Sequence, residues 1–230
     1  MTDQSELRLR MLHAAETQLS ASPEHDISTR AVCEAVGVGQ PVLYRLFGDK
    51  AGLLSALVDH GFDRYVQRKQ ALATTDDPLE DLRVGWDDHI AFALENPAIY
   101  RLMFSPMLAR QPAAPRTVFK LLTATLERCA EAGTLRVPPE IAAQQIMSAN
   151  IGVALALLVR PDIYTDPDLS ARVRDATFAG CVSRPSKEAQ GGSTALTATQ
   201  LAARLRRNPA PSLGAEEQHL LLKWLDGLGE

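Results

Sequence analysis

The residues best suited to catalysis or metal binding are few in this chain of 230 residues. Asp87, Asp88 and His89 are adjacent, which suggests an acid–base or metal site. Consecutive residues of a helix point in different directions, however, and no second cluster completes a coordination shell. The sequence also lacks a Ser-His-Asp signature, a phosphate-binding glycine loop and an HExxH motif. We therefore expect no catalytic residue, no metal and no cofactor.

The cysteines indicate the compartment. Cys33, Cys129 and Cys181 lie far apart and form no CxxC pair. This usage is typical of a reducing environment. The acidic N-terminus does not resemble a signal peptide, so we expect a cytoplasmic protein.

One segment, residues 141–159, carries no charge and approaches the ~20 residues that span a bilayer. Polar residues such as Gln144 and Asn150 interrupt its first half. We therefore expect a buried helix, packed between subunits, and no membrane partner.

Charge and composition are those of an ordinary globular protein. Lys and Arg number 24 against 28 Asp and Glu, the net charge is −4, and 46% of residues are apolar. This balance argues against a protein that coats nucleic acid by bulk charge. Any contact with DNA must therefore be local.

Helix signals recur along the chain. A polar residue followed by proline is typical of a helix start and occurs at Asp77-Pro78, Asn96-Pro97 and Asp166-Pro167. No alternation of apolar and polar residues indicates a sheet. We expect an all-α fold with helices over about 6–20, 28–36, 40–46, 49–69, 78–95, 97–104, 115–132, 139–159 and 167–183.

The C-terminal region differs in composition. Residues 185–194 read as a flexible link. Thr197 and Gln200 fit a capping box that opens a short helix. Leu221, Trp224, Leu225 and Leu228 then form an apolar stripe on a last helix, which packs on the body or a partner chain, or serves as a second interaction module.

The first fifty residues predict a helix-turn-helix. Leu9, Leu12, Ala15 and Leu19 mark one face of a first helix, and Ser28 caps a second. Gly37 breaks this second helix, because glycine adopts the left-handed conformation most easily. A third short helix follows over 40–46, with Pro41 in its first turn. Two short helices joined around a glycine form a motif whose second helix enters the DNA major groove.

The order Ser28, Gly37-Val38, Leu43-Tyr44, Phe47-Gly48-Asp49-Lys50 and Leu53-Leu54 resembles the N-terminal domain of the TetR family of bacterial transcriptional regulators. The resemblance is dense over residues 9–62. It implies a three-helix helix-turn-helix DNA-binding domain over 1–50, with a connecting helix to about 69. It further implies a helical ligand-binding and dimerisation domain over 71–184, followed by a linker and short helices over 185–230.

Carried over to this sequence, the resemblance places Tyr44 and Lys50 on DNA phosphates and Leu43 and Phe47 in the core. Lys50 would act from a helix N-terminus, whose positive end adds to its ammonium. The alternatives to contacts with DNA are a half-buried packing role for Tyr44 and a charge exposed to solvent for Arg45.

Gln40, Val42 and Arg45 are expected to point outward from the third helix. Arg45 suits a bidentate contact to guanine, and Gln40 an adenine edge or a phosphate, with Val42 beside them. Thr29 and Arg30 are phosphate candidates.

Two features depart from the family pattern. Residues 1–50 hold five basic and seven acidic side chains, a local net charge of −2. Gly39 also stands where the family commonly has a serine. We therefore expect low non-specific affinity and few phosphate contacts.

The resemblance implies a double-stranded DNA operator, a small-molecule effector and a homodimer as partners. The expected ligand pocket consists of Trp86, His89, Phe92, Tyr100, Met103, Phe104, Met107, Phe119 and Asn150, unless these residues form a plain core. The expected dimer interface consists of Ile146, Ala149, Gly152, Val153, Ala156, Val173, Ala176 and Thr177.

The function that follows is a ligand-responsive regulator, a repressor released from a palindromic operator by an apolar effector. The alternative is a helical protein-interaction module on the same fold, with weak or lost operator binding. The acidic N-terminal domain and the extra C-terminal helices favour this alternative.

Overall fold

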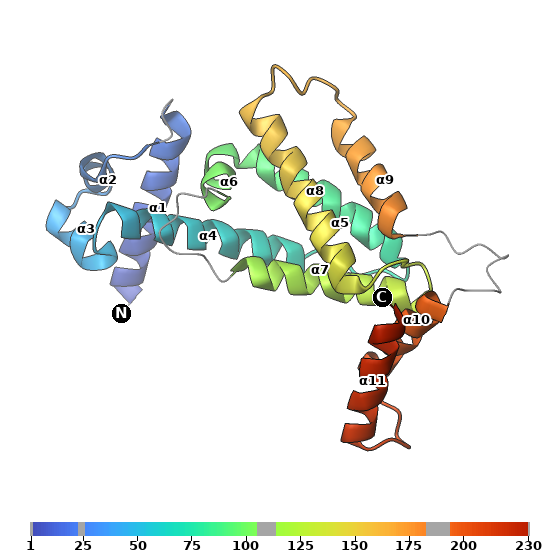
Figure 1. The fold of residues 1–230 in the computed structure, drawn as a ribbon. Helices are drawn as coiled ribbons and strands as arrows, with labels where there is room; N and C mark the ends of the chain where they lie inside the picture. The colour runs from blue at the N-terminus through green and yellow to red at the C-terminus, as the bar shows by residue number, and fades with distance from the viewer. Residues whose placement is uncertain (1, 23–25, 105–113, 183–193, 230) are drawn as a thin grey trace. The chain divides into compact units, whose positions relative to one another are not determined.

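The computed structural model describes residues 2–22, 26–104, 114–182 and 194–229. These residues form eleven α-helices and no β-strand, which confirms the all-α prediction (Figure 1). The helices are α1 (Thr2–Ala21), α2 (Thr29–Val36), α3 (Gln40–Phe47), α4 (Lys50–Gln70), α5 (Pro78–Glu95), α6 (Pro97–Met103), α7 (Ala114–Glu131), α8 (Pro139–Val159), α9 (Leu169–Cys181), α10 (Thr194–Arg207) and α11 (Ala215–Gly229).

The chain divides into two compact units. Unit 1 consists of Met1–Ala71 and Ala91–Thr117, and unit 2 of Leu72–Ile90 and Val118–Glu230. The three boundaries fall just after α4, inside α5 and inside α7. The helix-turn-helix and α6 therefore belong to one unit.

Unit 1 is built around an apolar core. Met11, Leu12, Ala15 and Leu19 of α1 are buried, whereas Leu9 is 47% exposed. The predicted stripe is therefore wrong at Leu9, which lies one turn before the buried part of α1.

The helices α4 and α6 approach each other closely in unit 1. A Cβ atom at Gly61 would lie 2.8 Å from Cγ1 of Ile99 and 3.1 Å from the sulfur of Met103. Gly61 is buried, and Ile99 and Met103 are buried with it. Only glycine leaves room for this packing.

Unit 2 contains α8 and α9, which lie side by side (Figure 1). Trp86 of α5 is buried, donates its indole N–H to the hydroxyl of Ser170 at 2.9 Å, and meets the ring of Phe178 edge-on. Arg128 of α7 pairs with Asp81 of α5 at 2.6 Å. These contacts join α5, α7 and α9 within the unit.

The helix α8 is, among the described residues, the one long and apolar enough to cross a membrane. A core helix of a soluble protein meets the same criteria. Ala142, Ile146, Asn150 and Ala154 bury one face of α8 inside this chain. The feature is therefore weak evidence for a membrane span.

The C-terminal helices α10 and α11 form a hairpin. Ala198, Ala202 and Leu225 are its buried core, and Leu221 packs against them. The predicted apolar stripe is thus only partly buried, because Trp224 is 60% exposed and Leu228 is 53% exposed.

Two predicted helix starts are wrong. The helix α9 begins at Leu169 after Asp168, because the carboxylate of Asp166 accepts the N–H of Asp168 in a turn before the helix. Thr197 lies inside α10, which begins at Thr194, so it does not cap the helix.

Candidate nucleic-acid interface

The helix-turn-helix forms as predicted. The hydroxyl of Ser28 accepts the N–H of Ala31, and Gly37 ends α2 in the left-handed conformation with φ of 74°. The N–H of Val38 then bonds the carbonyl of Cys33 at 3.0 Å. These bonds close the turn and direct α3 away from α2.

The helix α3 has a buried and an exposed side. Leu43 and Phe47 are buried, which confirms their predicted place in the core. Tyr44 is 46% exposed, and Gln40 and Arg45 are exposed as well. Gly39 precedes the helix and provides no side-chain cap, as its lack of a side chain requires.

The remaining candidate residues lie at the starts of α2, α3 and α4. Val42 and Thr29 are half-buried, and Arg30 is exposed. Arg30 pairs with Glu34 one turn later, with Nε at 2.8 Å from the carboxylate. The exposed cation at the start of α2 therefore has an intramolecular partner.

Lys50 is the first residue of α4. The carboxylate of Asp49 caps this helix by accepting the N–H of Gly52 at 2.7 Å. The Lys50 ammonium lies 2.6 Å from one carboxylate oxygen of Asp26 and 2.8 Å from the other. The hydrogen bond from Lys50 and that from the Ile27 N–H hold the pKa of Asp26 below its ordinary value.

Two residues near this surface had no sequence signal. Arg10 donates a hydrogen bond to the carbonyl of Val36 at 3.2 Å, near the end of α2. Asp26 is the second, because its pairing with Lys50 joins positions 24 residues apart. Sequence spacing could not have identified either contact.

The expected ligand-pocket residues fall in both units. Trp86, His89, Phe119 and Asn150 belong to unit 2, and Phe92, Tyr100, Met103 and Phe104 belong to unit 1. Met107 lies outside the described residues. Phe119 and Phe104 are half-buried and the other described members are buried.

Within unit 1 the aromatic residues form pairs. The ring of Tyr65 lies 4.9 Å from that of Phe92, and the ring of Tyr100 lies 4.7 Å from that of Phe104. Burial raises the pKa of Tyr100, so its hydroxyl stays protonated.

Within unit 2, Asn150 is the distinctive polar residue. Its amide nitrogen donates a long hydrogen bond of 3.4 Å to the carbonyl of Trp86. Its oxygen is buried and has no hydrogen-bond partner among the described residues. An unsatisfied buried acceptor is unfavourable, so the site suits a ligand or water that donates a hydrogen bond.

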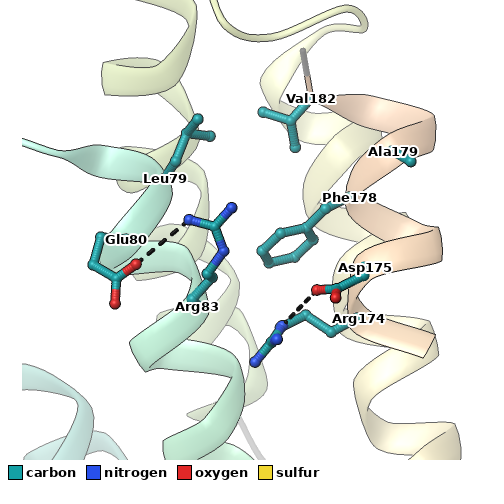
Figure 2. A pocket seen from close by; sticks show the side chains of 8 residues that line it. All are labelled: Leu79, Glu80, Arg83, Arg174, Asp175, Phe178, Ala179 and Val182. Atoms are coloured by element: carbon teal, nitrogen blue, oxygen red, sulfur yellow. Dashed lines mark hydrogen bonds and ion pairs between the residues drawn. The ribbon is translucent and has the colours of Figure 1, made fainter. Parts of the chain in front are cut away.

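The sequence did not predict the groove between α5 and α9. Its volume is about 570 Å³, and Figure 2 shows its walls facing each other. The lining residues are Leu79, Glu80, Arg83, Arg174, Asp175, Phe178, Ala179 and Val182. The two arginines and two acidic residues balance in charge, so the groove does not favour an ion of either sign.

The expected dimer residues divide by exposure. Ile146 and Val153 are buried inside this chain. Gly152 and Ala176 are exposed, and Ala149, Ala156, Val173 and Thr177 are half-buried. A Cβ atom at Gly152 would meet nothing within 4 Å. In the middle of α8, the exposed Gly152 and the half-buried Ala149 and Ala156 are therefore small residues with open space beside Gly152.

The adjacent Asp87, Asp88 and His89 do not form a metal site. Across the described ranges there is no group of three His, Cys, Asp or Glu side chains able to hold a metal ion. Asp87 instead pairs with Arg174 at 2.8 Å, and His89 is buried.

Family models match most of the helical body. The model for bacterial regulatory proteins of the tetR family matches residues 11–57. The model for the tetracyclin repressor-like C-terminal domain matches residues 82–182. The first match contains the helix-turn-helix, and the second ends before α10 and α11.

Relatives and solved structures are similar at low identity. The nucleoid occlusion factor SlmA of Alteromonas mediterranea is 24% identical over 186 residues, which cover 79% of this chain and 89% of that protein. SmeT, the repressor of the Stenotrophomonas maltophilia efflux pump SmeDEF, has 23% identity and a TM-score of 0.61 over 77% of this chain and 91% of its own. NalD, the secondary repressor of the Pseudomonas aeruginosa pump MexAB-OprM, has 20% identity and a TM-score of 0.56 over 80% of this chain and 100% of its own. These structures share the fold.

Proposed function

Because the chain belongs to the TetR family of bacterial regulatory proteins, we propose that it is a ligand-responsive transcriptional regulator that binds a DNA operator. It acts in the cytoplasm as a repressor, binds a palindromic operator as a homodimer, and is released by a small, mostly apolar effector. The observation that carries this proposal is the exposed face of α3, from which Gln40, Tyr44 and Arg45 project while Leu43 and Phe47 anchor the helix in the core.

The exposed face of α3 has the chemistry for base and phosphate contacts. A guanidinium binds the major-groove edge of guanine in a bidentate manner, and a carboxamide suits adenine. Arg45 is exposed and forms no ion pair with any described residue, so it is available for such a contact. Tyr44 and Lys50 would bind phosphates and fix the orientation of α3.

Dimerisation would supply the second α3 helix. The small residues Ala149, Gly152 and Ala156 on α8 and Ala176 on α9 allow a second copy to approach closely. A two-fold dimer places its recognition helices about 34 Å apart, one turn of DNA. The operator would therefore be palindromic.

The effector would be apolar with few polar groups. Within unit 2, the buried ring of Trp86 and the unsatisfied oxygen of Asn150 support an apolar molecule that carries a hydrogen-bond donor. SmeT, a protein of similar fold, has a solved structure in complex with triclosan, which supports a small-molecule effector. An effector lowers operator affinity by its preference for one conformation, typically ~1–3 kcal/mol.

Selection of bound duplexes from a random DNA pool by the purified protein tests this proposal. We expect a palindrome with half-sites about one helical turn apart. The variant Arg45→Ala should lose the preference at one base of each half-site, while the core of the protein stays intact. Recovery of no enriched sequence by the wild type would overturn the proposal.

A second candidate function is a helical interaction module with weak operator binding. The net charge of −2 over residues 1–50 and the hairpin of α10 and α11 favour it. The relatives named nucleoid occlusion factors are consistent with a role other than transcription. A protein that shows no sequence preference but is retained by a partner protein through α11 would support this candidate.

A further inference from the structure

Asp26 is held in place before the helix-turn-helix. Its N–H donates to the hydroxyl of Ser22 at 3.3 Å, and its carboxylate accepts the N–H of Ile27 at 2.8 Å. The side chain of Asp26 is 61% exposed and that of Lys50 is 43% exposed. The carboxylate therefore meets the Lys50 ammonium at the surface, within reach of a large anion.

The carboxylate of Asp26 occupies the position that an anion would take on Lys50. Both of its oxygens lie within 2.8 Å of the ammonium nitrogen. A DNA phosphate presents the same chemistry, a pair of anionic oxygens, to the same donor. Lys50 cannot turn fully to a phosphate without opening this ion pair.

Arg30, like Lys50, forms an ion pair with a carboxylate of the same chain, and Arg45 does not. Arg30 pairs with Glu34, whereas Arg45 has no ion pair with a described residue. Two cations placed for phosphates are thus neutralised inside the chain, while the cation placed for a base has no ion pair in the described part of the chain. These two ion pairs therefore lower the affinity that comes from phosphate contacts, which does not depend on the DNA sequence.

Resting on the proposed function, we propose that Asp26 is a determinant of DNA affinity that competes with the DNA backbone for Lys50. The competition weakens binding to any duplex. Only an operator whose bases also bind α3 then holds the protein at physiological salt.

Substitution Asp26→Asn tests this inference. The Asn oxygen can still accept the Ile27 N–H, so the local turn is retained. Without the carboxylate, Lys50 is free and the repulsion between Asp26 and phosphate is removed. One such charge interaction near 4 Å in water changes affinity by about fivefold, so we expect affinity for both the operator and random duplex to rise about 3- to 10-fold at ~0.1 M salt. The plot of log affinity against log salt should steepen by about 0.9, one phosphate contact.

Controls separate this effect from bulk charge. Asp59→Asn makes the same change in charge on α4, nine residues after Lys50. Asp59 lies about 13 Å from Lys50 along the helix axis, beyond the Debye length of ~10 Å at 0.1 M salt. We expect little change for this variant. In the background Lys50→Ala, the substitution Asp26→Asn should raise affinity less than it does in the wild type, because only the repulsion between Asp26 and phosphate is then relieved.

Fluorescence anisotropy with labelled operator and random duplexes gives all of these values. Equal affinities for the wild type and Asp26→Asn, or an equal gain for Asp59→Asn, would overturn the inference while leaving the proposed function intact. If no variant binds either duplex, the proposed function fails and the inference fails with it.

Discussion

The guanidinium of Arg64 on α4 donates a hydrogen bond of 2.5 Å to the side-chain oxygen of Asn96, the residue that precedes α6. Another nitrogen of Arg64 bonds both carboxylate oxygens of Glu16 on α1, at 2.8 and 2.9 Å. Asn96 therefore does not cap α6 with its side chain, although the Asn-Pro sequence predicts a cap. One side chain joins three helices of unit 1.

Arg64→Met should destabilise unit 1. The change leaves the Glu16 carboxylate, which is 20% exposed, without its partner. We expect a loss of about 1–3 kcal/mol in the free energy of unfolding in urea, typical of hydrogen bonds to a charged group. Arg68→Met is the matched control, because its partner Glu95 is 58% exposed, and it should lose less than about 1 kcal/mol. Equal losses would contradict the bridging role.

Gly61→Ala should also be destabilising. The added methyl group would lie 2.8 Å from Ile99, so α4 and α6 must separate or Ile99 must leave its position. We expect a loss of about 1–3 kcal/mol on thermal or urea unfolding. Gly85→Ala, an open helical glycine, should instead gain about 0.5–1 kcal/mol. A stabilising effect at Gly61 would show that the helices are not in close contact.

The cysteine thiols should be unreactive in the native protein. Cys33, Cys129 and Cys181 are all buried. Burial raises the pKa of Cys129 to about 12 and that of Cys181 to about 11, so neither forms a thiolate near neutral pH. A thiol reagent at about pH 8 should label the folded chain slowly and the denatured chain at once.

These raised pKa values also set the sign of a pH effect. The free energy of unfolding is unaffected by these thiols below the pKa of about 8.5 that they have in the unfolded chain. Above that pH it decreases until the pH reaches their raised pKa values in the folded chain, because only the unfolded chain loses the protons. Rapid labelling of one thiol in the native state would contradict the burial of that residue.

Gly152→Gln tests the proposed dimer. A Cβ atom at this exposed position would meet nothing within 4 Å, so folding should be unaffected. In a dimer packed through α8 it would separate the small-residue faces. We expect a monomer by light scattering at concentrations where the wild type is a dimer. Gly85→Gln, another open helical glycine, should stay dimeric. A dimeric Gly152→Gln would place the interface elsewhere.

Local signals in the sequence predict most of the fold. Ser28, Gly37 and Pro41 act within a few residues, so the helix-turn-helix follows from them directly. Features that depend on distant residues were not predictable. The Asp26–Lys50 pair spans 24 positions. The failure of Asn96 to cap α6 follows from Arg64, which is 32 residues away.

In the predicted site, too, the features set by local sequence were predictable and those set by distant residues were not. The exposure of Tyr44 and Arg45 and the burial of Leu43 and Phe47 follow from the helical period of a short helix. Exposure along the second half of α8 does not, because residues 151–159 carry no polar side chain on any side of the helix. Burial of Ile146 and Val153 but not Gly152 is decided by which neighbours pack against the helix.

Reading of a palindromic operator by α3 is the central claim, and a comparison of affinities tests it most directly. The measurement is the affinity of the wild type and of Arg45→Ala for the selected palindrome and for random duplex at one salt concentration. We expect the wild type to prefer the palindrome by about 10³-fold or more. Arg45→Ala should lose about 1–3 kcal/mol on the palindrome and much less on random DNA. Equal affinity of the wild type for both duplexes would contradict the account.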